Sequence, residues 1–272
     1  MPPPSAASPS TVLLPSTASA ASSTPESTPA GDVTPAALRC LSRYYGGRVV
    51  RRGDSFVLEL GSGKVVPYDD GREKSFDERL ESPDLEDMFT PRYHRGALAP
   101  VTDLNFDPGR ARPALLFEAT YGATAEAVEH ELVVVKLVSS RISVHRRAAE
   151  SLRRVSSRLS AFVGQHPEWA ALFSPLGGGF NFRNVAGTEQ RSAHAYGVAI
   201  DLNPKFGAYW RWQKTWENRI PSEVVEAFES EGFIWGGRWF HFDTMHFEYR
   251  PELLDESCYE DGVKAEEREG AP

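Results

Sequence analysis

Apolar and polar positions alternate in recognisable patterns from about residue 36 onward. The run 49–71 contains short β-branched stretches interrupted by Gly-Asp and Gly-Ser-Gly, which is typical of short strands joined by turns. The run LVVVKLV at 132–138 predicts a buried strand, and Thr124 is placed to cap a short helix before it. Between residues 144 and 163, apolar side chains recur every three or four positions, which predicts one long amphipathic helix.

The C-terminal half continues this mixture. Pro221 and the serine after it favour a helix start, and Gly232 stands where that helix should end. The segment 233–249 is expected to return as a strand with a Gly-Gly kink. Earlier, the run 198–202 alternates Val, Ile and Leu with smaller or polar residues. On a strand, this alternation places Asp201 on the face opposite the three apolar side chains.

The two ends of the chain differ in composition from the rest. Residues 1–35 are almost wholly Pro, Ala, Ser and Thr, with too little apolar surface to offset the entropy of ordering. We expect a disordered tail or linker there, and a degenerate secretory signal is the alternative. Residues 257–272 are acidic and predict a frayed tail. A single folded domain is therefore expected over 36–256.

Composition excludes several classes of protein. The net charge of −8 argues against a general nucleic-acid binder, which would be basic. No apolar run approaches the roughly 18 residues that span a bilayer, so no transmembrane segment is expected. Cys40 and Cys258 are too few for a disulfide framework, and the sequence leaves open whether they pair.

An acidic stretch at 75–89 invites a metal-binding interpretation. Asp84, Glu86 and Asp87 could bind calcium, but they lack the loop spacing of an EF-hand. A solvated acidic face is the favoured interpretation.

The strongest candidate chemistry lies in two separate segments, RSAHAYGVAIDLN at 191–203 and HFDTMHFEY at 241–249. Together they offer His194, Asp201 and His246, and two imidazoles with one carboxylate make a suitable zinc set. Asp243, three positions before His246, is the candidate for an acid that is not a ligand. This combination predicts a zinc hydrolase.

Each of these residues, taken singly, is more often an ordinary loop or strand-end residue, and only their joint appearance favours a site. Glu248 shares a strand face with His246 and is expected to orient an imidazole, with metal ligation as the alternative. Arg183 and Arg191 flank the first segment, and either could hold an oxyanion. His241, next to an apolar strand, is expected to be structural.

The segment SAHAYGVAIDLN, followed by WGGRW and DTMHFEY, resembles the D-alanyl-D-alanine carboxypeptidase family of zinc peptidases. That family includes vancomycin-resistance D,D-peptidases and L-alanyl-D-glutamate endolysins, and it shares a fold with the hedgehog signalling domain. Its pattern is S-x-H-x-x-G-x-A-x-D, followed by an acid shortly before a histidine. The resemblance covers about residues 178–250.

The resemblance implies an α+β fold in which a small antiparallel sheet carries the zinc ligands and helices pack on it. It implies that Zn2+ is bound by His194, Asp201 and His246. It further implies Asp243 as general base, Arg183 at the scissile carbonyl, Ser192 and Tyr196 as substrate contacts, and Glu248 behind a ligand. Many relatives carry glutamate as the base, and Asp243 is one methylene shorter, which bears on the substrate class.

The activity implied is hydrolysis of a peptidoglycan stem peptide, at D-Ala–D-Ala or a nearby bond, by a monomer outside the cytoplasm. L-alanyl-D-glutamate endopeptidase activity, an amidase on the same polymer and a non-catalytic zinc module that binds cell wall or protein are the alternatives. A binding module would have no need of Asp243 or Arg183.

Overall fold

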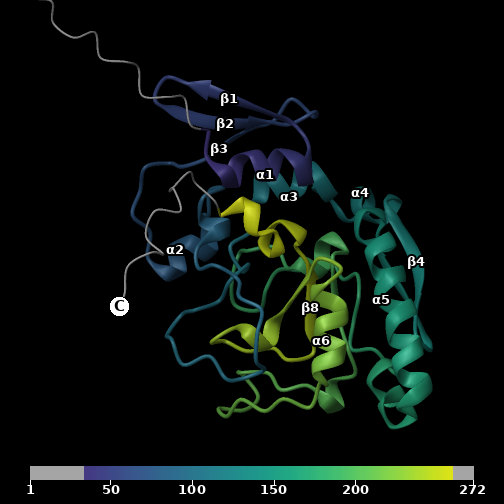
Figure 1. The fold of residues 1–272 in the computed structure, drawn as a ribbon. Coiled ribbons are helices and arrows are strands. Elements are labelled where there is room, and N and C mark those ends of the chain that lie inside the picture. The colour runs from purple at the N-terminus through teal and green to yellow at the C-terminus, as the bar shows by residue number, and fades with distance from the viewer. Residues whose placement is uncertain (1–33, 260–272) are drawn as a thin grey trace, which may run out of the picture. The chain divides into compact units, whose positions relative to one another are not determined.

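The computed structural model describes residues 34–259, and the strands within that range form three small antiparallel sheets (Figure 1). The first sheet contains β1 (Arg48–Arg52), β2 (Ser55–Glu59) and β3 (Val65–Pro67). The second is a hairpin of β4 (Leu132–Leu137) and β5 (Ser140–His145). The third has the strand order β6 (Ala199–Asp201), β8 (His246–Tyr249), β7 (Phe233–Trp235). The expected α+β class with a small antiparallel sheet is confirmed.

The N-terminal sheet follows the predicted turns. β1 and β2 are joined through Gly53, whose φ of 63° lies in the left-handed region that glycine adopts without strain. Helix α1 (Ala36–Tyr45) lies directly against this sheet in Figure 1. Leu38 and Leu41 of α1 are fully buried in one apolar cluster with Leu58 of β2. The sheet is therefore held to the rest of the domain by α1.

The middle of the chain forms a helix, a hairpin and a long helix. Thr124 caps α4 (Ala125–His130) by accepting a hydrogen bond from the backbone N–H of Ala127 at 3.2 Å. The long helix α5 (Arg146–Gln165) begins later than the apolar periodicity suggested, because Val144 belongs to β5. Its buried stripe contains Ala148, Leu152, Val155 and Leu159. This stripe packs into the main apolar cluster and confirms the predicted amphipathic helix.

The third sheet forms the centre of the domain. Helix α6 (Ser222–Glu229) lies alongside β8 in Figure 1, and the rings of Phe228 and Phe247 stack at 4.0 Å between centroids. The expectation of one kinked strand over 233–249 is wrong, since β7 and β8 are two antiparallel strands. At Gly236 an added Cβ would lie 2.5 Å from the carbonyl oxygen of Asp243. The Gly-Gly pair therefore permits a chain reversal and not merely a kink.

The acidic stretch also differs from its prediction. It includes the short helix α2 (Phe76–Glu81). The next α-helix in the chain, α3 (Ala114–Tyr121), lies outside this stretch. The Lys74 ammonium lies 2.7 Å from a carboxylate oxygen of Asp84 and of Asp87, and 3.2 Å from one of Asp70. Because the Lys74 side chain is 1% exposed, these groups form an internally neutralised cluster and not a solvated face.

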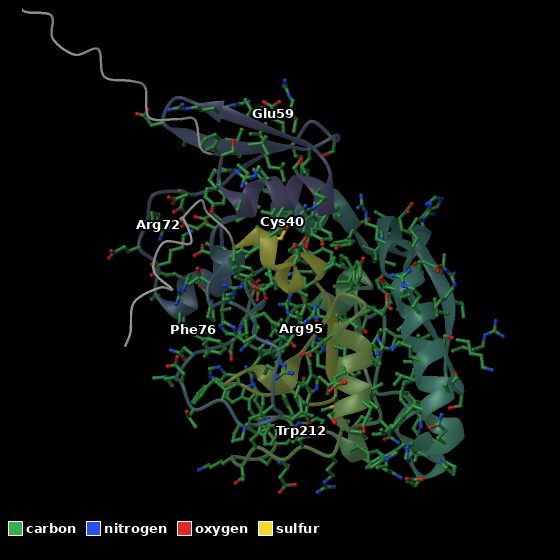
Figure 2. The ribbon with its side chains drawn as sticks, in the orientation of Figure 1. Cys40, Glu59, Arg72, Phe76, Arg95 and Trp212 are labelled. Carbon is green, nitrogen blue, oxygen red and sulfur yellow. A yellow bond between two sulfur atoms is a disulfide. The ribbon has the colours of Figure 1, made fainter. Side chains whose placement is uncertain are left out.

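The ends of the described chain are joined covalently. Cys40 of α1, labelled in Figure 2, forms a disulfide with Cys258, and their Cα atoms lie 5.3 Å apart. Residues 257–259 of the predicted tail therefore lie within the folded unit, in and just after a 3-10 turn at Glu256–Cys258. The remainder of that tail, and residues 1–33 of the predicted N-terminal segment, fall outside the described residues. Within 34–259, every helix is too short or too polar to cross a bilayer.

Candidate metal centre

Three predicted ligands meet at the edge of the third sheet. His194 Nε2 lies 3.2 Å from Asp201 Oδ2, and His246 Nδ1 lies 3.0 Å from Asp201 Oδ1. One donor atom from each of the three residues falls within 4.8 Å of the other two. The tertiary structure therefore brings Asp201 into contact with His246, which lies 45 positions later in the sequence.

Local structure explains how each ligand reaches this point. The register of the sheet pairs Asp201 of β6 directly with His246 of β8. His194 lies in the 3-10 turn Ala193–Tyr196, and Ser192 caps this turn by accepting the His194 backbone N–H at 3.3 Å. Gly197 ends the turn with a φ of 67°, and an added Cβ would lie 2.7 Å from Leu132 Cδ2. A glycine is therefore required there by both conformation and space.

Polar contacts at the outer ring atoms, a hydrogen bond for His194 and a longer ion-pair contact for His246, direct the inner nitrogens toward the cluster. His194 Nδ1 lies 2.7 Å from the carbonyl oxygen of Gly179, so it carries the proton and leaves Nε2 as a free donor atom. In His246 the two ring nitrogens exchange these roles. Its Nε2 is the outer atom, 3.6 Å from Glu248 Oε2, and its Nδ1 is the inner atom that faces Asp201. Two neutral imidazole nitrogens and a carboxylate oxygen at this spacing fit a divalent metal ion.

The close approach of these groups shifts their pKa values. Burial works to raise the pKa of Asp201, but the charges and hydrogen bonds of His194 and His246 outweigh it and hold that pKa well below its ordinary value. Burial works to lower the pKa of His246, but hydrogen bonds to Asp201 and Glu248 raise it to about 10. The cluster therefore favours a cation beside Asp201, and a metal ion would take the place of the His246 proton.

Glu248 lies behind His246, as the sequence suggested, but its main partner was missed. The Glu248 carboxylate is fully buried and accepts two hydrogen bonds from Arg112, at 2.7 Å from Nε and 2.5 Å from Nη2. Burial opposes ionisation, yet the Arg112 charge lowers the pKa of Glu248 well below its ordinary value. An arginine more than 130 positions away carries no motif that would connect it to Glu248 in the sequence.

Asp243 lines the same cleft as the three candidate ligands. Burial and, secondly, the negative charge of Asp201 raise the pKa of Asp243 to about 7. Its Oδ1 is buried with no hydrogen-bond partner among the described residues. The segment is held from two sides, because Asp243 forms a bridge with Tyr209 and its N–H donates to the carbonyl of Gly236 at 3.0 Å. This carboxyl group is suited to exchange a proton near neutral pH.

A cleft of about 360 Å³ is lined by Asp243 and the candidate ligands. Some of the remaining residues predicted to contact substrate line this cleft and others do not. Arg183 and Ser192 line it together with the three ligands and Asp243. Arg191 does not line it, because its guanidinium stacks on Phe182 at 4.3 Å. The predicted substrate contact of Tyr196 does not agree with its position, because its ring is buried against Phe117 at 5.4 Å and does not line the cleft.

Aromatic side chains form one wall of this cleft. Trp210, Trp212 and Trp239 line it, and Trp212 is 67% exposed on a loop that Figure 2 labels. Trp210 is tied to the Asp243 segment through its backbone N–H, which donates to the carbonyl of Phe242 at 3.0 Å. An exposed indole at a cleft is typical of a surface that contacts a ligand.

His241 is more than the structural residue that the sequence suggested. Its ring lines the cleft, and its Nδ1 lies 2.7 Å from Asp107 Oδ2. The Asp107 side chain is fully buried and also pairs with Arg110 at 2.6 Å. Because Asp107 fixes one ring nitrogen, the other is left as a hydrogen-bonding group for the cleft. The sequence signal was absent, since Asp107 is more than 130 positions away.

Comparison with known proteins adds a family to this geometry. Residues 186–249 match the model of a peptidase family described as D-alanyl-D-alanine carboxypeptidase, which confirms the resemblance stated from the sequence motifs. The matched range contains the three ligands, Asp243 and Glu248, whereas Arg112, Asp107 and Arg183 lie outside it. Comparison with curated proteins and with solved structures gave no significant match.

Proposed function

We propose, from the match of residues 186–249 to the D-alanyl-D-alanine carboxypeptidase model, that this protein is a zinc peptidase that cleaves peptidoglycan stem peptides. The bond that we favour is D-Ala–D-Ala. The observation that carries the proposal is the convergence of His194, Asp201 and His246 beside an Asp243 with a pKa near 7. A module that only binds a partner would need the metal but not this carboxyl group.

The metal ligands and Asp243 have different roles in the proposed reaction. A zinc ion held by the three ligands would polarise the peptide carbonyl and lower the pKa of a water molecule to about 7. Asp243 accepts a proton from the attacking water at its unpaired Oδ1 and delivers it to the departing amine. Its raised pKa suits both steps, because the proton is accepted and released at similar free energy.

The walls of the cleft bind and orient the substrate. Arg183 hydrogen-bonds the scissile carbonyl and stabilises the negative charge that develops on its oxygen. Arg110 offers further donors on the same cleft, while His241, whose Nδ1 donates to Asp107, presents Nε2 as an acceptor. Donors of this kind suit the free carboxylate at the end of a peptide, which favours a carboxypeptidase over the L-alanyl-D-glutamate endopeptidase alternative.

The site of action that we infer is outside the cytoplasm. The Cys40–Cys258 disulfide supports this, because disulfides persist in oxidising compartments and are rare where thiols are kept reduced. Peptidoglycan stem peptides are exposed in such a compartment, so the disulfide and the proposed substrate agree.

The decisive experiment uses Asp243→Ala with purified muropeptides, followed by mass determination of the products. We expect loss of D-alanine release by at least about 100-fold with zinc content retained, because general base catalysis contributes roughly 10²–10⁴-fold. Asp103→Ala is the matched control, since Asp103 is exposed and does not line the cleft. Unchanged turnover in Asp243→Ala would refute the peptidase mechanism, and release of a different fragment would redirect it to the endopeptidase or amidase alternatives.

A further inference from the structure

A continuous chain of buried charges leads away from His246 on the side opposite Asp201. Glu248 faces His246 Nε2 at 3.6 Å and accepts the fork of Arg112. On its other side, Glu248 Oε1 lies 3.4 Å from Arg250 Nη1. Arg250 in turn donates from Nε to Glu252 at 2.6 Å. The chain thus alternates in charge from the metal ligand to the residues after β8.

The far end of this chain is anchored in α1. Tyr45 donates its hydroxyl hydrogen to Glu252 Oε1 at 2.9 Å. Arg250 also donates from Nη1 to the carbonyl of Gly109 at 2.5 Å, and this glycine lies three positions before Arg112. Two separate segments, one around residue 110 and one in α1, therefore hold the chain in place.

The charges of the chain balance without a contribution from His246. Glu248, Arg250 and Glu252 have fully buried side chains, and the Arg112 side chain is 6% exposed. Two arginines face two glutamates, so His246 is not needed as a cation in this group. A neutral His246 is the form that binds a metal ion. The buried charges of the chain are therefore paired with one another, and its contact with His246 Nε2 acts on the orientation of the ring.

We propose that Arg112 is a positioning residue of the metal centre: it fixes the Glu248 carboxylate, which holds His246 Nε2 and turns Nδ1 toward the metal. This rests on the proposed zinc site. His246 and Glu248 share one face of β8, so the orientation of one side chain decides the space left for the other. Arg112 supplies the two short hydrogen bonds that hold the Glu248 carboxylate in that orientation, and Arg250 Nη1 adds a longer one at 3.4 Å. The rest of the buried charged chain is formed by residues outside the family match, namely Arg250, Glu252 and Tyr45.

The test compares Arg112→Met and Arg112→Lys in the full chain, with the zinc Kd measured by competition against a chromophoric chelator. In Arg112→Met we expect the zinc Kd to rise by about 10- to 100-fold, the usual effect of removing a group that orients a metal ligand. Arg112→Lys keeps the charge but loses the two-pronged contact, so its Kd should rise by only roughly 3- to 10-fold. The absorption spectrum of the Co2+-loaded variants should change in the same order, because the His246 ring is less well directed.

The matched control is Arg154→Met, which makes the same chemical change at an exposed ion pair between Arg154 and Glu231. Its zinc Kd and Co2+ spectrum should equal those of the wild type. Thermal unfolding of the metal-free proteins measures any general loss of stability. A loss of stability alone would leave the Co2+ spectrum of the folded protein unchanged, whereas a wrongly oriented His246 ring would change it.

An unchanged Kd and an unchanged Co2+ spectrum in a folded Arg112→Met protein would overturn the positioning role. If Arg112→Met does not fold, Arg112→Lys decides the matter by the same two measurements. A wild-type protein that binds no zinc would overturn the proposed function itself, so the two failures are distinguishable.

Discussion

Two clusters that contain acidic side chains are candidate metal sites in this protein, and they differ in the source of the positive charge that balances their carboxylates. Around Lys74, three carboxylates surround an ammonium group that is almost fully buried. Around Asp201, the ion-pair partners are two histidines, which carry a charge only when protonated. The first cluster therefore contains a lysine cation, whereas in the second the positive charge is a proton on His246 that an added metal ion would replace.

The difference shows why acidic residues alone are a poor signal for a metal site. Buried carboxylates repel one another unless a cation lies among them, and a lysine serves as well as a metal ion. Asp84 and Asp87 satisfy this need within the chain, through Lys74. The donor set at Asp201 instead contains imidazole, which binds zinc strongly when neutral. The type of donor, and the presence or absence of an internal ammonium, distinguishes the two clusters.

The largest expected effect comes from breaking the metal group. His194→Ala should lose stoichiometric zinc and reduce release of D-alanine by more than about 1000-fold, because it removes a ligand from a site with three protein donors. Chelation of zinc from the wild type should have the same effect, reversed by added Zn2+. Lys74→Met, in contrast, should keep both zinc and activity. Loss of bound zinc in Lys74→Met would mean that the two clusters are not independent.

An intermediate effect is expected from breaking the Lys74 cluster. Lys74→Met leaves three carboxylates without their cation and should lower the free energy of unfolding by about 2–3 kcal/mol, below the range for fully buried pairs because Asp70 is partly exposed. Urea unfolding monitored by tryptophan fluorescence measures the change. Glu86→Ala, at an exposed position of the same stretch, is the control and should change stability by less than about 0.5 kcal/mol. Equal stabilities of Lys74→Met and wild type would show that the cluster contributes nothing.

The smallest effect is a difference in how the two clusters respond to pH. For Asp84, burial works to raise the pKa, but the hydrogen bonds from Lys74 and from the backbone N–H groups of Asp70 and Asp87 together outweigh it, so the pKa lies below the ordinary 3.8. A lowered carboxyl pKa stabilises the fold above pH 3.8, and this contribution is lost as the pH falls through the lowered value. Hydrogen bonds to Asp84 and Asp87 outweigh burial and raise the pKa of Lys74 above the ordinary 10.5, so its contribution is lost only as the pH rises through that raised value.

The stability gap between wild type and Lys74→Met should therefore stay constant from pH 5 to 9 and narrow outside that range. Zinc binding should weaken steadily as the pH falls from 9 to 5, since the pKa of His246 is raised to about 10 in the metal-free protein and its proton must leave before the metal binds. Unfolding curves at fixed zinc across this pH range separate the two. A gap that closes near pH 6 would contradict the assignment of the stabilising charge to Lys74.

Sequence reasoning was most successful where contacts are local. The cap at Thr124, the stripe of α5 and the strand that carries Asp201 follow from neighbours along the chain, because helices and strands repeat with fixed periods. It was least successful where a partner is distant. Arg112 behind Glu248 and Asp107 beside His241 carry no local signal, since any of thirty lysines and arginines or thirty-eight acidic residues could fill such a role.

The sequence by itself therefore determined the candidate ligand types, their spacing and the resemblance to a peptidase family, because a metal site needs particular side chains in a particular order. Only the tertiary structure decided that Arg183 and not Arg191 lines the cleft, and that Tyr196 is turned into the core. It also decided that Cys40 meets Cys258. Such choices depend on which surfaces approach one another when the elements pack, and packing is a property of the whole chain that no short segment encodes.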